Sequence, residues 1–213
     1  MNRTEEIYLK DTDESAALAL KTADEFLEPF SIGQKEKFHL RLLAEETVGM
    51  VKAMTGKFRA AFWMEEENGE FRVKLTVKTD MDIDKKKELL SLSTSGRNAA
   101  VKGFMGKIRE IIENGLLNYD SVMKLEQEYS GGSVDYVLLG SGCVGELPMT
   151  YPVGGEGFTW SLSNYRDALN TVPESDKPEK EAWDELEKSI VANIAKNVIV
   201  GVVRDRVDLT IIA

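Results

Sequence analysis

A carboxylate and a glycine four positions apart mark the most promising candidate for a small-molecule site in this sequence. Glu45 and Gly49 lie in the stretch 34–54, whose apolar residues recur at helical spacing. Residues four apart share one side of a helix of about 3.6 residues per turn. Asp80 follows the end of a predicted strand, 71–77. We expect any small-molecule site to lie where this helix faces the end of that strand.

The predicted helix at 34–54 is apolar on two sides. One stripe collects Leu40, Leu43, Ala44, Thr47, Val51 and Met54. Phe38 and Leu42 fall on nearly the opposite side, together with Glu45 and Gly49. Since a helix with two apolar faces is usually covered on both, we expect Glu45 and Gly49 to lie beside a lid, another helix or a ligand instead of open water.

Two antiparallel hairpins are predicted. In the first, apolar and polar residues alternate over 71–77, 58–64 supplies the matching strand, and Asn68-Gly69 provides the turn. The second pairs Val198–Val203 with Val207–Ile212. Other expected elements are helices at 13–30 (capped by Asp13 or Ser15), 85–92, 99–117, 118–129 and 182–197, a strand at 134–139, and a long loop at 141–170 containing one strand and a short helix at Ser163–Leu169.

This order of elements predicts the α+β class. We expect a two-layer sandwich in which helices pack on one face of a mostly antiparallel sheet of about four or five strands. The whole chain, 1–213, is interpreted as a single domain with a long loop insertion at about 130–175.

Composition restricts the kinds of partner. The chain has 213 residues, one cysteine (Cys143) and a net charge of −10, so its field repels phosphate backbones. We therefore expect no direct nucleic-acid partner. The sequence shows no secretory signal and no apolar run of about 20 residues that could span a bilayer. These features predict a cytoplasmic protein with no membrane partner.

The sequence argues against several kinds of active site and leaves one further candidate site with no reaction assigned to it. His39 is the only histidine, which excludes a catalytic triad and a multi-histidine metal site. The triplet Asp80, Asp82 and Asp84 resembles the start of a calcium loop, but Lys85 and Ser91 stand where its glycine and glutamate are required. The chain could also be an enzyme of another class whose site uses Cys143, Glu146, Tyr151 and Glu156 in the glycine-rich loop. The spacing of these residues does not indicate a particular reaction.

The helix with an internal glutamate, the hairpin, the acidic strand end, the polar loop and the next helix together resemble the ATP-binding domain of the gyrase and histidine-kinase type. The pattern is most similar to the bacterial anti-sigma serine kinases. In that family a helix carries E-x-x-x-N, whose glutamate orients the attacking water and whose asparagine holds Mg²⁺. A strand then ends in D-x-G-x-G, whose aspartate accepts the adenine amino group, and a glycine-rich lid wraps the phosphates.

The resemblance places Glu45 at the catalytic glutamate and Asp80 at the adenine aspartate, with Gly96 in the lid region. Arg97 is a candidate basic group for the anionic ligand. Gly49 replaces the asparagine and Asp82 replaces the first glycine of the strand motif. Because a glycine side chain cannot hold Mg²⁺, the implied ligand is ATP or ADP without efficient metal binding.

The resemblance therefore implies a degenerate, regulatory member of the family. We expect it to act on a protein partner, such as a sigma factor or another regulator, with a homodimer also allowed. The alternative is an active ATP-dependent serine/threonine kinase of the anti-sigma type with altered motifs. That alternative requires a substitute Mg²⁺ ligand, for which Glu46 is the nearest candidate, although it points about 100° away around the helix.

Overall fold

The computed structural model describes residues 1–10, 12–52, 58–79, 104–106, 108–109, 112, 157–171, 184, 186–203 and 206–213. The strands in these parts are β1 (Asn2–Arg3), β2 (Ile7–Leu9), β3 (Phe58–Glu67), β4 (Glu70–Thr79), β5 (Gly157–Ser161), β6 (Asn197–Val203) and β7 (Arg206–Ile212). The helices are α1 (Asp13–Leu27), α2 (Gln34–Lys52), α7 (Leu162–Thr171) and α9 (Ile190–Ile194). None of the helices in these parts combines the length and the apolar character needed to cross a membrane.

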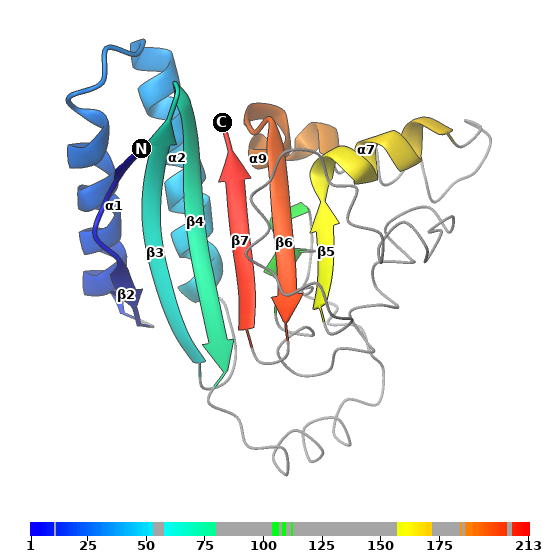
Figure 1. Cartoon of the computed structure of the whole chain (residues 1–213), viewed down its shortest axis with the longest axis horizontal. Coiled ribbons are helices and arrows are strands. Elements are labelled where there is room, and N and C mark those ends of the chain that lie inside the picture. The colour runs from blue at the N-terminus through cyan, green and yellow to red at the C-terminus, as the bar shows by residue number, and fades with distance from the viewer. Residues whose placement is uncertain are drawn as a thin grey trace.

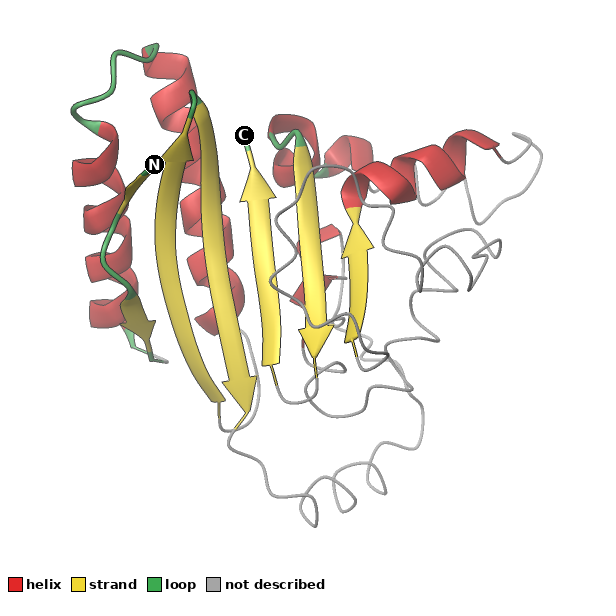
Figure 2. Ribbon diagram, in the orientation of Figure 1, coloured by secondary structure: helices red, strands yellow, loops and turns green. Residues whose placement is uncertain are grey.

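A seven-stranded sheet forms the centre of the fold, in the order β1-β3-β4-β7-β6-β5, and β2 also pairs with β3 (Figure 1). The described strand pairs are all antiparallel. Helices α1 and α2 lie together behind the sheet, where α1 contacts β3 and α2 contacts β4 (Figure 2). This arrangement confirms the predicted α+β class with a mostly antiparallel sheet.

The first hairpin is confirmed, with β3 and β4 in register from Phe58↔Thr79 to Glu67↔Glu70. Asn68 and Gly69 form the two-residue turn with φ values of 54° and 82°, the positive-φ conformation that Asn-Gly adopts readily. The inward side chains of β4 are buried against the helices, as alternation predicts: Phe71, Val73, Leu75 and Val77.

The second hairpin is also confirmed, since β6 and β7 pair from Asn197↔Ile212 to Val203↔Arg206. Strand β6 is buried on both faces, because Val198 and Val200 point one way and Ile199 the other. The strand and short helix expected within the 141–170 loop correspond to β5 and α7. The strand expected at 134–139 lies outside the described residues, as do the helices expected at 85–92 and 118–129 and most of the one at 99–117.

Three local predictions are corrected. The residue that caps α1 is Thr12, whose hydroxyl accepts a hydrogen bond from the Ser15 backbone. The helix predicted at 182–197 is interrupted at Ser189, which is extended at φ −86° and ψ 120° and caps the short α9. That helix ends at Ile194, short of the predicted 197, because Ala195 is extended at φ −71° and ψ 135°.

The sheet has more strands than the predicted four or five, partly because β1 and β2 lie along the edge of β3. Three residues separate Arg3 from Ile7, whereas two separate their partners Glu65 and Phe62, so the edge contains a bulge of one residue. Thr4 fills the gap, since its backbone N–H donates to Met64 O at 3.0 Å and its hydroxyl accepts from Met64 N at 3.1 Å. Such short strands carry no periodic pattern.

Candidate functional site

One face of α2, the helix that carries Glu45, packs as predicted. Helix α2 packs against β4, so it lies beside the strand that leads toward Asp80. The apolar stripe of α2 is buried in this interface: Leu40, Leu43, Ala44, Thr47 and Val51. Thr47 is satisfied within the helix, because its hydroxyl donates to the Leu43 carbonyl at 2.7 Å. The positioning of the candidate helix is thus explained by packing alone.

The expectation that the second face of α2 is covered is wrong. Phe38 is 60% exposed, Glu45 and Gly49 are exposed and Leu42 is half-buried. A Cβ added at Gly49 would meet no atom within 4 Å. Apolar residues on this face therefore belong to the surface, which commonly contains single hydrophobic side chains.

Glu45 takes part in a shared ion pair. Arg41, one turn earlier on α2, has its Nη1 at 3.5 Å from Glu45 Oε2 and its Nε at 2.8 Å from Asp24 Oδ1 on α1. The Glu45 side chain is 60% exposed, so water screens this contact. One guanidinium therefore joins the candidate catalytic carboxylate to the α1–α2 interface, and Glu45 is not an isolated base.

Gly49 offers no ligand atom on the same face. Its backbone is helical and a side chain would fit there, so the missing ligand reflects the residue type and not a lack of space. Asp80, Asp82, Gly96 and Arg97 lie outside the described residues, as do Cys143, Glu146, Tyr151 and Glu156. Among the residues that the structure describes, no three His, Cys, Asp or Glu side chains gather to hold a metal ion.

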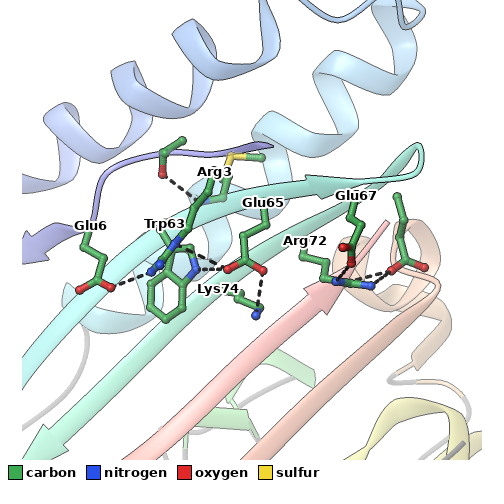
Figure 3. A network of polar contacts seen from close by, with 10 residues as sticks. Arg3, Glu6, Trp63, Glu65, Glu67, Arg72 and Lys74 are labelled. Atoms are coloured by element: carbon green, nitrogen blue, oxygen red, sulfur yellow. Dashed lines mark hydrogen bonds and ion pairs between the residues drawn. The ribbon is translucent and has the colours of Figure 1, made fainter. Parts of the chain in front are cut away.

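A second polar cluster, on the face of the sheet away from α1 and α2, was not predicted from the sequence. We call this side the outer face. The centre of the cluster is Glu65 of β3, which is only 4% exposed (Figure 3). Its carboxylate accepts a hydrogen bond from Trp63 Nε1 at 2.7 Å, and it lies 2.8 Å from Lys74 Nζ and 3.6 Å from Arg3 Nε.

The environment of Glu65 keeps its carboxylate ionised. Burial acts to raise the pKa of Glu65, but the hydrogen bonds from Lys74 and Trp63 and the charges of Lys74 and Arg3 together lower it below the ordinary value. Arg3 also lies over the Trp63 ring, 4.8 Å from its centroid, a distance typical of cation–π contacts. With its oxygens occupied by donors, Glu65 is a structural anion that ties β1 to β3 and β4.

Part of this cluster could have been found from the sequence. Alternation in the first hairpin already places Trp63, Glu65 and Lys74 on one face. Counting back from the Asn68-Gly69 turn puts Trp63 opposite Lys74, as the structure has it. Arg3 could not be found, because its place depends on the pairing of β1 with residues more than sixty positions away.

Comparisons with protein-family models, with curated proteins and with solved structures found no match for this chain.

Proposed function

We propose that this chain is a regulatory protein with a degenerate ATP-binding fold, which acts by binding a protein partner and has an adenine nucleotide as its candidate ligand. One observation carries the proposal. On the exposed face of α2, Glu45 faces Arg41, and the next position on that face is Gly49, which has no ligand atom. A helix of this kind offers a carboxylate but lacks the metal ligand that phosphoryl transfer requires.

The arrangement of the neighbouring elements supports the same proposal. Two helices precede the β3–β4 hairpin, and the second helix packs on β4, which is the element order that underlies the resemblance to the gyrase and histidine-kinase type. The pairing of Arg41 with both Asp24 and Glu45 also favours weak catalysis. A general base must be free to reach the proton that it removes, whereas Glu45 Oε2 lies 3.5 Å from Arg41 Nη1.

Calorimetric titration of the whole chain with ATP and ADP, with and without Mg²⁺, tests this proposal. We expect nucleotide binding that Mg²⁺ does not strengthen. The matched variant is Gly49→Asn, which the open space around Gly49 accommodates and which restores the family's metal ligand. In this variant Mg²⁺ should strengthen binding. Absence of binding at millimolar nucleotide in both proteins would remove nucleotide from the proposal.

The alternative function is an active serine/threonine kinase of the anti-sigma type. It is favoured by the exposure of the Glu45 side chain, which stays open to solvent despite its contact with Arg41. Turnover of ATP by the wild-type chain that Glu45→Ala abolishes would establish this alternative. Turnover that Glu45→Ala leaves unchanged would show that Glu45 is not the base.

A further inference from the structure

The face of α2 that points away from the sheet carries a short coiled-coil pattern. Phe38 follows Lys35 by three positions, Leu42 follows Phe38 by four, and Glu45 follows Leu42 by three. This is the spacing of alternating a and d positions in a heptad repeat. Phe38 is 60% exposed, Leu42 is half-buried, and Lys35 and Glu45 are exposed. We call these four residues the α2 ridge.

Other surfaces of α2 are already used within the chain. The stripe from Leu40 to Val51 is buried, and α2 contacts β4 (Figure 1). Helix α1 lies along α2, where Arg41 Nε is 2.8 Å from Asp24 Oδ1, and α9 also contacts α2. The α2 ridge is therefore the part of this helix that is open to another molecule.

The order of residues along the α2 ridge makes it complementary to itself. In an antiparallel pair of such helices, with the two-fold axis beside residue 40, Phe38 of each copy faces Leu42 of the other. Lys35 of each copy then faces Glu45 of the other. A parallel pair would instead place Lys35 against Lys35 and Glu45 against Glu45. Charge thus favours the antiparallel arrangement.

We propose that the α2 ridge is an interface between two copies of this chain, which pack as an antiparallel pair of helices. The apolar pairs at the centre lose contact with water, which drives the association. The ion pairs at both ends set the register and the orientation. A shift of one heptad is unfavourable, because it places the apolar Leu42 against the carboxylate of Glu45.

The existing contact of Glu45 is compatible with this arrangement. Arg41 Nη1 lies 3.5 Å from Glu45 Oε2, and the Glu45 side chain is 60% exposed. That distance is longer than the usual hydrogen bond of about 2.7–3.2 Å. Since an ionised carboxylate has about four acceptor sites, Glu45 can accept from Lys35 of the second copy and keep Arg41. The proposal therefore requires no unpaired charge.

The association should be reversible, because the ridge is short. From Lys35 to Glu45 it extends about 15 Å along the helix, and interfaces below about 1,200 Å² are typical of transient complexes. The inference goes beyond the proposed nucleotide ligand and does not depend on it. A second copy over Glu45 and a nucleotide bound by Glu45 would exclude each other, so the nucleotide titrations need protein dilute enough to be monomeric.

Sedimentation equilibrium of the whole chain without nucleotide, at about 5–500 μM protein, tests the inference. The wild type is compared with Phe38→Ala, Lys35→Glu and Glu45→Lys, and with an equimolar mixture of the two charge variants. Matched controls are Leu18→Ala, which truncates another exposed apolar side chain (51% exposed), and Lys10→Glu, which reverses another exposed charge. Circular dichroism establishes that each variant is folded.

We expect the wild type to dimerise and the two controls to match it. Phe38→Ala should weaken the dimer at least tenfold, because each copy loses a buried aromatic ring. Lys35→Glu and Glu45→Lys should each weaken it by about tenfold, since like charges then meet at both ends. In their mixture every glutamate of one variant faces a lysine of the other, so association should return as a heterodimer.

Three results would overturn the inference: a wild type that stays monomeric at about 500 μM, equal weakening in the controls, or folded charge variants whose mixture associates no better than either alone. If Glu45→Lys does not fold, Phe38→Ala and Lys35→Glu still decide whether this face is the interface. A monomeric wild type that binds nucleotide refutes only the helix pair, and a dimer that binds no nucleotide refutes only the nucleotide proposal.

Discussion

Replacing Gly49 by alanine should stabilise the protein. Gly49 lies within α2, three residues before its end at Lys52, and a Cβ there meets no atom within 4 Å. Glycine costs about 0.5–1 kcal/mol relative to alanine inside a helix, because its backbone loses more conformational freedom on folding. With no steric penalty to offset this, Gly49→Ala should raise the free energy of unfolding by that amount.

Thermal melting and urea denaturation measure this change. For a chain of this size, about 1 kcal/mol corresponds to a shift in Tm of about 2–4 °C. The matched control is Gly33→Ala, which also has open space around its Cβ. Gly33 precedes α2, and its carbonyl accepts the hydrogen bond from Lys37 N at 3.0 Å. Alanine is disfavoured at that capping position, so the same chemical change should lower the Tm.

The result that would refute this reasoning is a loss of stability in Gly49→Ala. A loss of more than about 1 kcal/mol would mean that a group approaches the backbone closely at Gly49, because overpacking has costs of that size. The face that carries Glu45 would then be covered, as the apolar pattern of the sequence suggested. Unchanged stability in Gly49→Ala, with the expected loss in Gly33→Ala, would show that α2 frays before position 49.

Three further predictions concern the first hairpin. Glu65→Gln should lower the free energy of unfolding at neutral pH by about 2 kcal/mol, because it removes a charge-assisted set of hydrogen bonds; the loss should vanish in acid. Since the folded-state pKa of Glu65 is below its ordinary value of 4.5, its stabilisation is present above that pH and is lost as the pH falls further, which denaturation at a series of pH values measures. Trp63→Phe should cost about 1 kcal/mol and be non-additive with Glu65→Gln in a double-mutant cycle; additive effects would mean that the 2.7 Å hydrogen bond contributes nothing. Gly69→Ala should cost about 1–2 kcal/mol in thermal melts, because φ is 82° there; an unchanged Tm would mean that the turn adjusts its conformation.

The hairpins could be predicted because the sequence patterns that specify them lie within the hairpins themselves. In β4 the alternation of buried and outward residues is unbroken from Phe71 to Lys78, and Asn68-Gly69 specifies both the turn type and the register. In α2 the stripe from Leu40 to Val51 was predicted correctly for the same reason, since one helix face must be buried against the sheet.

The second face of α2 could not be judged from the sequence. Phe38 and Leu42 look like residues that need a cover, but exposed apolar side chains are common on folded proteins. What lies over them depends on the positions of other elements, which periodicity within one helix does not contain. For the same reason, the ion pair between Arg41 and Asp24 could not be predicted, because it exists only once α1 and α2 pack together.

The edge strands β1 and β2 could not be predicted from the sequence, both because they are short and because distant residues stabilise them. A strand of two or three residues has few ladder hydrogen bonds of its own, so distant side chains hold it in place. Asn2 donates to Glu66 at 2.7 Å and Arg3 approaches Glu65 at 3.6 Å, both across more than sixty positions of sequence. Sequence patterns report regular local structure, whereas these contacts are single and non-local.

The two faces of the sheet suit different kinds of interaction. The face covered by α1 and α2 is apolar along β4 from Phe71 to Val77, so its main contribution is stability. On the outer face, Glu65 is surrounded by cations and is therefore neutralised within the fold. A charge that is satisfied within the fold adds little to recognition, because binding a partner would first have to break its existing contacts.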